Sequence, residues 1–158
     1  MSRNTLVREV MTTDVLTFRP TDTIDVAARA LSQRRLGGAP VLDDDGRVVG
    51  LLEDDDLIVQ DSQLHVPTVI SLFGAYLELP SALAHFERDL RKAVAATVGD
   101  VMDTDPPTCR PDDTLETVAT ILHDKGGSRL PVVDDDRRLL GIVSRGDLVR
   151  DIVGHAGR

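Results

Sequence analysis

The sequence predicts an α/β (α+β) protein made of two copies of one β-α-β-β-α unit, with a partly helical insertion between them. The first observation behind this fold is an internal repeat, because residues 7–58 return as residues 98–149 at a constant offset of 91 (Met102 minus Met11), without a gap. Roughly two aligned positions in five are identical, which is typical of a duplicated supersecondary unit. The second observation is hydrophobic periodicity, which changes from strand-like to helix-like in the same order in both copies.

The repeat divides the chain into a first repeat at 7–58, an apolar and helical insertion at 59–97, and a second repeat at 98–153. Each repeat is too short to bury a large core alone, so we expect the two to share one core. The 158-residue chain has a formal net charge of −9 and a sequence pI near 4.8. Because nucleic-acid binders concentrate Lys and Arg, this acidic balance predicts no binding to DNA or RNA.

Cysteine usage and hydropathy indicate the cellular compartment of the protein. Cys109 is the only cysteine, which excludes an intramolecular disulfide and fits a reducing cytoplasm. The N-terminus lacks the apolar run of a secretory signal, and the most apolar stretch, 66–79, is short and contains Pro67 and Glu78. We therefore expect a cytoplasmic protein with no membrane partner.

Each repeat opens with a short β-prone stretch. In the first copy this stretch is Val15–Phe18, and Pro20 ends it. In the second copy, Pro106 and Pro107 restrict the stretch to an extended, edge-like segment, because proline donates no ladder hydrogen bond. We expect a weaker strand there.

An amphipathic helix follows, since apolar residues recur at i, i+3, i+4 and i+7 in both copies: Ile24, Ala27, Ala28 and Leu31, then Leu115, Val118, Ala119 and Leu122. An acidic residue three positions after Asp22 and after Asp113 gives a capping-box-like spacing, which predicts both helix starts. Paired glycines predict the helix ends, at Gly37-Gly38 and Gly126-Gly127.

A β-hairpin completes each repeat, and another helix begins directly after it. The predicted strands are 40–42 and 48–52 in the first copy, and 131–133 and 139–143 in the second. The turn between them contains three consecutive aspartates in both copies, at 43–45 and at 134–136.

The repeats resemble the cystathionine-β-synthase-type (CBS) domain, two of which pair as a Bateman module. The resemblance covers both repeats, and its most specific pieces are Val10-Met11, Val101-Met102, 110–115, 128–133 and 141–148. It implies a stand-alone tandem pair whose two three-stranded sheets pack face to face about a pseudo-twofold axis, with two clefts between the repeats. Similar proteins hold adenosine-containing ligands in these clefts, and similar pairs associate into disk-like homodimers.

The resemblance places the main ligand site in the second repeat. In the family, an aspartate at the position of Asp147 accepts hydrogen bonds from the ribose hydroxyls, and the hydroxyl at the position of Ser144 meets phosphate. The start of the following helix favours an anion, Gly141 allows close backbone approach, and Arg145 and Arg129 add charge-assisted contacts. The predicted ligand-binding residues are Thr108, Arg110, Arg129, Leu130, Pro131, Ser144, Arg145 and Asp147.

Plainer interpretations of these residues stay open. Ser144 and Asp147 also form an ordinary capping box, which would stabilise the helix without a ligand. Both roles are compatible, because in this fold the capping residues face the cleft. Arg129 at a strand entry is equally well explained as a solvated surface residue.

The first repeat differs where phosphate would bind. Asp56 keeps the ribose position, but Glu53 replaces the hydroxyl and Asp54 replaces the position of Arg145. At about 5 Å and an effective dielectric near 20, each like-charge contact costs on the order of 3 kcal/mol, which outweighs a neutral hydrogen bond of about 1 kcal/mol. We expect this cleft to reject phosphate and to take adenosine, a cationic adenosyl compound such as S-adenosylmethionine, a metal-bridged nucleotide, or nothing. Its predicted residues are Thr17, Ala39, Pro40 and Asp56.

The aspartate triplets raise the alternative of a calcium or magnesium site, since clustered carboxylates bind hard cations. We favour a polar hairpin turn, because both triplets lie between β-prone runs and their spacing differs from an EF-hand loop. The four histidines are scattered, and no nucleophile, base and orienting carboxylate form a catalytic set. We predict no enzyme activity, no metal and no required cofactor.

The insertion contains an apolar stretch and, from about Ser81, a helical pattern. Phe73, Tyr76 and Phe86 lie in it, so either a partner surface or packing against the repeats is expected.

Together, these features predict a regulatory module that senses a small molecule. An adenine nucleotide (AMP, ADP or ATP) or S-adenosylmethionine binds mainly through the second repeat and changes how the repeats sit against each other. The output lies in a regulated protein that the sequence does not identify. The alternative is a ligand-free homodimeric interaction scaffold.

Overall fold

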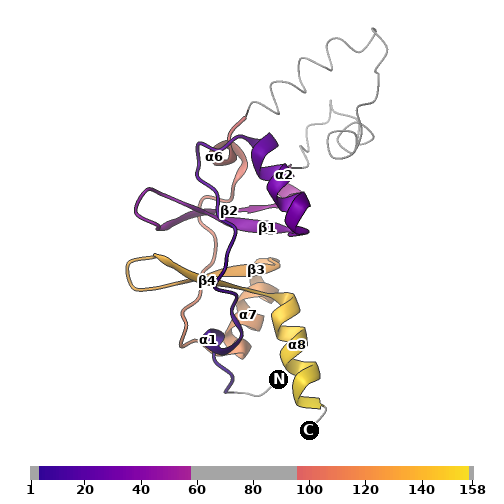
Figure 1. Ribbon diagram of the computed structural model, residues 1–158. Coiled ribbons are helices and arrows are strands. Elements are labelled where there is room, and N and C mark those ends of the chain that lie inside the picture. Colours follow the sequence, from indigo (N-terminus) through magenta and orange to yellow (C-terminus); the bar gives the residue numbers. More distant parts are fainter. Residues whose placement is uncertain (1–3, 58–95, 157–158) are drawn as a thin grey trace, which may run out of the picture.

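The computed structural model describes residues 4–57 and 96–156, and Figure 1 shows two β-hairpins stacked at its centre with helices on either side. The elements in chain order are α1 (Val7–Val10), α2 (Ile24–Arg34), β1 (Gly38–Leu42), β2 (Val48–Glu53), α3 (Asp54–Leu57), α6 (Val98–Val101), α7 (Leu115–Lys125), β3 (Arg129–Val133), β4 (Leu139–Ser144) and α8 (Arg145–Ala156). Apart from Ala96 and Thr97, the predicted insertion lies outside the described residues.

The first strand predicted in each repeat is reduced to a single parallel bridge. Phe18 pairs with Val41 in the first repeat, and Cys109 pairs with Val132 in the second. The prolines that flank these stretches cannot donate ladder hydrogen bonds, so the pairing does not extend. Each sheet is therefore an antiparallel hairpin with one bridged segment beside it, rather than three full strands.

The long helix of each repeat begins one residue later than the predicted capping box. Thr23 is the N-cap of α2, and its hydroxyl accepts the Val26 N–H at 3.4 Å. Asp22 instead accepts the Arg19 N–H at 2.8 Å, which closes the turn before the helix. The second repeat makes the same two kinds of bond through Thr114 and Asp113.

The two helices end differently. Helix α7 ends at Lys125, and Gly126 follows in the left-handed conformation with φ 70°, as the paired glycines predicted. Helix α2 ends at Arg34, ahead of Gly37 and Gly38, and Arg35 takes the left-handed conformation with φ 53°. The prediction that Gly37 and Gly38 end the first helix is therefore wrong, because Arg35 accepts a backbone conformation that favours glycine.

Aspartate side chains stabilise the hairpin turns by accepting hydrogen bonds from backbone N–H groups. One carboxylate oxygen of Asp43 accepts the N–H groups of Asp45 and Arg47, both at 2.9 Å. Asp134 makes the equivalent two bonds in the second repeat, also at 2.9 Å. These contacts support the interpretation of each triplet as a polar turn.

Each entry helix packs on the opposite repeat, which the sequence pattern did not indicate. The Val7 N–H donates to the Asp113 carbonyl at 2.8 Å, and Thr12 exchanges two backbone bonds with Ile142, each 2.9 Å long. The equivalent residues 98 and 103 contact the first repeat in the same way. Figure 1 accordingly shows α1 beside α7 and α8, and α6 beside α2.

The exchange produces two hydrophobic cores, not the single shared core that we expected. One cluster joins Val7 to the second repeat and also contains Cys109, Leu115, Val118, Leu122, Leu130, Val132, Val143 and Leu148. The other joins Val98 to the first repeat and also contains Phe18, Ala27, Leu31, Ala39, Val41, Leu52 and Leu57. Both cores include residues from both repeats, so neither repeat is complete without the other.

The hairpins meet near their turns. The Val48 N–H donates to the Arg137 carbonyl at 2.9 Å, and the Leu139 N–H donates to the Gly46 carbonyl at 3.1 Å. An antiparallel bridge joins Arg47 to Arg138, which are equivalent positions because 138 minus 47 is 91. A contact between equivalents marks the pseudo-twofold axis between the two sheets.

Candidate functional site

Asp56 and Asp147, the two carboxylates predicted to contact ribose, lie at helix starts directly after a hairpin. Asp147 accepts the backbone N–H of Ser144 at 2.7 Å and its hydroxyl at 3.0 Å. Asp56 accepts the backbone N–H of Glu53 at 2.8 Å. Asp147 therefore makes the capping contacts to Ser144 that the plainer interpretation predicted. Asp56 makes only the backbone contact, because Glu53 has no hydroxyl.

Asp147 lines a pocket of about 440 Å³ and does not point to bulk water, since only 6% of the residue is exposed. Arg150, one turn further along α8, pairs with its second carboxylate oxygen. The pocket lies between α8 and α1 and is lined by Val10, Asp147, Arg150, Asp151, Gly154 and His155.

A second pocket, of about 430 Å³, lies between the repeats, and we call it the acidic cleft. Its lining contains five carboxylates and two cationic side chains: Glu53, Asp55, Asp56, Asp103, Asp105, Lys125 and Arg129. Leu51, two prolines and two glycines complete it. Acidic side chains from both repeats meet here, and the rejection of phosphate by this cleft stays a prediction.

Asp103 and Asp105 were not among the predicted site residues. They follow α6, and the exchange of the entry helices brings them to the first repeat. The sequence carried a signal for one of them, because Asp105 repeats Asp14 at the offset of 91. That signal becomes informative only once the exchange is known.

The charge of the acidic cleft acts on Asp56. Burial raises the pKa of this carboxyl above its ordinary value, the hydrogen bond from the Glu53 N–H opposes that rise, and the negative charges of Asp103, Asp55 and Asp54 add to it. An added anion at this place would meet the same repulsion.

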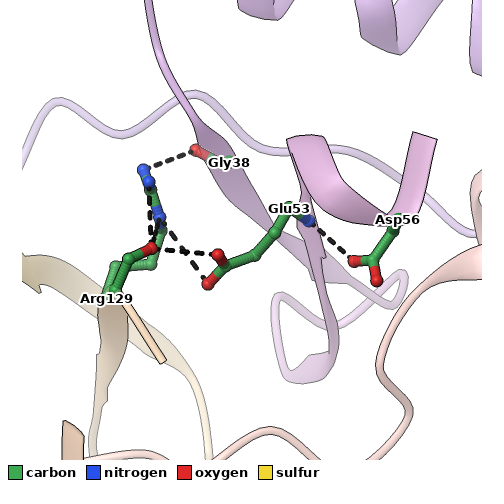
Figure 2. A network of polar contacts seen from close by, with 5 residues as sticks. Gly38, Glu53, Asp56 and Arg129 are labelled. Carbon is green, nitrogen blue, oxygen red and sulfur yellow. Dashed lines mark hydrogen bonds and ion pairs between the residues drawn. The ribbon is translucent and has the colours of Figure 1, made fainter. Parts of the chain in front are cut away.

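Arg129, the first residue of β3, reaches across to the first repeat (Figure 2). Its Nη1 donates to the Gly38 carbonyl at 3.3 Å, and its Nε lies 3.8 Å from Glu53 Oε1. The Ser128 hydroxyl donates to Glu53 Oε2 at 2.9 Å and accepts from the guanidinium of Arg129 at 3.2 Å. We call Glu53, Ser128 and Arg129 the Arg129 network.

The structure brings together only some of the predicted ligand residues. Asp56 and Arg129 share the acidic cleft, whereas Asp147 lines the other pocket. Arg110 donates to the Asp134 carbonyl at 2.9 Å and pairs with Asp135, so it binds the hairpin turn.

The remaining predicted residues differ mainly in their exposure. Four of them are buried in the hairpin strands: Ala39, Pro40, Leu130 and Pro131. Thr17, Thr108 and Ser144 are half-buried, and Arg145 is exposed.

Cys109 is a buried thiol whose pKa burial raises to about 12, with Asp113 adding to the rise. Such a thiol is protonated at neutral pH and is a poor nucleophile. Within 4–57 and 96–156, no group of three or more His, Cys, Asp or Glu side chains is placed to hold a metal ion. No helix of that same part of the chain is long and apolar enough to cross a membrane.

Two hairpin-and-helix repeats, related by a pseudo-twofold axis and presenting a carboxylate at each helix start, define a paired-repeat module with ligand-sized pockets. The family model described as "CBS domain" matches the chain twice, at residues 7–61 and 98–154. The chain belongs to the CBS-domain family and contains a tandem pair of its domains.

Several relatives match almost all of the chain. Protein MJ1426 of Methanocaldococcus jannaschii is 32% identical over 94% of this chain and 91% of its own length. The chloroplastic CBSX1 of Arabidopsis thaliana is 37% identical over 87% of this chain but only 58% of its own length. The chain therefore spans little more than half of that relative.

Solved structures show the same fold. CBSX2 of Arabidopsis thaliana superposes with a TM-score of 0.76 at 27% identity, covering 98% of this chain and 99% of that one. The structure of CBSX2 in complex with AMP gives a TM-score of 0.71 at 28% identity, covering 96% of this chain and 98% of that one.

Proposed function

We propose that the chain is a regulatory module that senses an adenosyl small molecule, either an adenine nucleotide or S-adenosylmethionine. The observation that carries this proposal is the nearly buried carboxylate of Asp147, which faces a pocket at a helix start in a CBS pair. A pocket of about 440 Å³ falls in the size range of small-molecule sites. The AMP complex of CBSX2, similar to this chain over 96% of its length, supports the choice of ligand class.

The second repeat is the proposed main site. Asp147 binds the ribose hydroxyls there, and Ser144 and Arg145 meet the phosphate at the start of α8. A carboxylate that accepts two hydroxyl groups binds a ribose diol well, because charge-assisted hydrogen bonds are stronger than neutral ones. The ligand must displace Arg150 from Asp147 or use the remaining acceptor capacity of the carboxylate.

The acidic cleft is the proposed weaker site. Its five carboxylates favour an adenosyl ligand without phosphate or with a positive charge, such as S-adenosylmethionine. The two proposed sites then differ in ligand preference.

Ligand binding acts as a signal only if the ligand binds two arrangements of the repeats with different affinities. The exchanged entry helices couple the repeats mechanically, since each helix packs in the core of the opposite repeat. The output is proposed to lie in a separate regulated protein, and the module itself is proposed to have no catalytic activity. We also propose that it works in a reducing cytoplasm, where its buried Cys109 stays a thiol.

Isothermal titration calorimetry with AMP, ATP, adenosine and S-adenosylmethionine tests the proposed function. We expect at least one of these ligands to bind the wild-type chain, and Asp147→Ala to weaken nucleotide binding by about tenfold or more. Asp147→Asn is the matched control for folding, because its amide oxygen can still accept the Ser144 N–H. Absence of binding to the folded wild-type chain would refute the proposal.

The second candidate function is a ligand-free homodimeric scaffold, and the outer face of α8 favours it. Val149, Ile152 and Val153 are 57%, 47% and 66% exposed there. Exposed branched aliphatic side chains at i, i+3 and i+4 form an apolar stripe that a partner covers at a gain in free energy. Light scattering at micromolar concentration distinguishes a dimer from a monomer, and a dimer that ignores every adenosyl ligand would favour the scaffold.

A further inference from the structure

Arg129 lies at the pseudo-twofold axis. Its guanidinium donates to the Gly38 carbonyl at 3.3 Å, and these two positions are equivalents, because 129 minus 38 is 91. Equivalent positions contact each other only beside the axis that relates them. The backbone of Arg129 pairs with that of Ser144 in the neighbouring strand, and its side chain lines the acidic cleft.

Two glycines of the first repeat make room for this side chain. A Cβ atom at Gly37 would lie 2.7 Å from Nη2 of Arg129, and one at Gly38 would lie 3.1 Å from its Nε. A larger residue at either position would compete with the guanidinium for the same space. The structure places one arginine here, and the two repeats differ at this position.

Glu53 supplies the anion that Arg129 faces. It occupies the position of Ser144 in the first repeat, where a hydroxyl is expected to meet phosphate. Its carboxylate accepts the Ser128 hydroxyl at 2.9 Å and lies 3.8 Å from the guanidinium (Figure 2). The side chains of Arg129 and Glu53 are only 16% and 21% exposed, so solvent screens their attraction less than that of a surface pair.

We propose that Glu53 is a specificity-determining residue that holds Arg129 in place of a ligand phosphate. A ligand with a phosphate must take the guanidinium from Glu53, whereas a nucleoside without phosphate leaves the Arg129 network intact. Glu53 thereby lowers the affinity for phosphate-bearing adenosyl ligands and leaves the affinity for adenosine unchanged. This inference rests on the proposed function, because it concerns the ligand class of the same clefts.

Calorimetric titration of the full chain with AMP and with adenosine tests this role. Glu53→Ser introduces the residue that the second repeat has at the equivalent position, so the fold already accommodates it. We expect the acidic cleft of the variant to bind AMP about tenfold more tightly than that of the wild type, the effect of removing one charged competitor, and to bind adenosine within about twofold of the wild type. Glu53→Gln keeps the side-chain size and removes the charge, and a gain of the same sign is expected.

Two controls make the result specific to Arg129. Adding Arg129→Gln to Glu53→Ser is expected to remove the gain for AMP, and circular dichroism melting checks that each variant is folded. The proposal is overturned if Glu53→Ser leaves AMP affinity unchanged, if AMP and adenosine gain equally, or if the gain survives without Arg129. Failure of the proposed function looks different, because the wild type then binds neither AMP nor adenosine. In that case a gain of AMP binding by Glu53→Ser still supports the role of Glu53, and no gain overturns it.

Discussion

At the scale of single residues, the two repeats have arginine in one copy and glycine in the other at two equivalent positions with left-handed backbone conformation. Arg35 has φ 53° where the second repeat has Gly126, and Arg137 has φ 63° where the first repeat has Gly46. A left-handed conformation costs about 1 kcal/mol or more for a residue with a Cβ atom. Duplication thus preserved the backbone path even where the favourable residue was lost.

Arg35→Gly is expected to stabilise the protein by about 0.5–1 kcal/mol, because it relieves the left-handed strain after α2. Gly126→Arg is the matched control and is expected to lower the free energy of unfolding by about 1 kcal/mol. Nothing lies within 4 Å of a Cβ built there, so the loss comes from the backbone conformation alone. Urea unfolding measures both changes. Equal stability of Gly126→Arg and the wild type would contradict the expected cost of a left-handed arginine at position 126.

Asp56 gives stability a pH dependence of definite sign. Its folded pKa is raised, mainly by burial, so the folded state holds the proton more tightly than the unfolded state. The contribution of Asp56 to stability is therefore greatest below the unfolded pKa of 3.8 and falls as pH rises through the raised folded pKa. Asp56→Asn removes this loss. We therefore expect the melting temperature of the variant, relative to that of the wild type, to rise between about pH 3.5 and pH 7.

Asp100 is the control with the opposite sign. Hydrogen bonds from the backbone and hydroxyl of Thr97 lower its pKa, so its stabilisation is present above the unfolded pKa and disappears as pH falls through the folded one. Asp100→Asn should therefore lose stability at neutral pH and little in acid. The same trend in both variants would show that cleft burial does not govern Asp56.

At the scale of the elements, the exchange of α1 and α6 decides what a repeat is. A sequence repeat of 7–58 and 98–149 describes the duplication, but each structural core takes its entry helix from the other copy. The clefts inherit this exchange, since Asp103 and Asp105 follow α6 and line the pocket that contains Asp56.

Val7→Ala is expected to destabilise the protein by about 2 kcal/mol, because it leaves a cavity in the second repeat's core at a fully buried position. Hydrogen exchange should show faster exchange in β3 and β4 than in β1 and β2. Val98→Ala should produce the reverse pattern. Loss of protection in the first repeat's own hairpin after Val7→Ala would contradict the exchange.

Gly141→Ala tests the close approach of the exchanged segment. A Cβ at Gly141 would lie 2.7 Å from the Thr12 carbonyl oxygen, a backbone atom that cannot move alone. We expect a loss of about 2 kcal/mol in the free energy of unfolding. Gly154→Ala, in α8 with open space around its Cβ, is the control and should stabilise by about 0.5 kcal/mol.

Periodicity predicted the helices and hairpins well, because both copies carry the same pattern and each copy checks the other. The bridged first strands and the two cores depend on contacts between distant segments, which no local pattern encodes. The later helix starts follow from local bonds to the hydroxyls of Thr23 and Thr114. The site shows the same division. Asp56, Asp147 and the acidic character of the first cleft were readable from the 91-residue offset, whereas Asp103, Asp105 and the position of Arg129 required the pseudo-twofold axis.

At the scale of the whole molecule, a nearly symmetric backbone carries an asymmetric distribution of charge. The acidic cleft has five carboxylates and two cationic side chains, while the pocket of Asp147 has two carboxylates together with Arg150 and His155. Arg129 stands between the two halves at the axis. A ligand that takes Arg129 from Glu53 in the acidic cleft would change a contact between the two repeats, which is the physical basis for the proposed sensing.

Native mass spectrometry of the full wild-type chain, purified under mild conditions and incubated with AMP, ATP or S-adenosylmethionine, tests this sensing role most directly. We predict a folded chain that carries an added mass equal to one of these adenosyl ligands and loses it when Asp147 is replaced by alanine. A folded chain that shows only its ligand-free mass with all three compounds at millimolar concentration would contradict the proposed function.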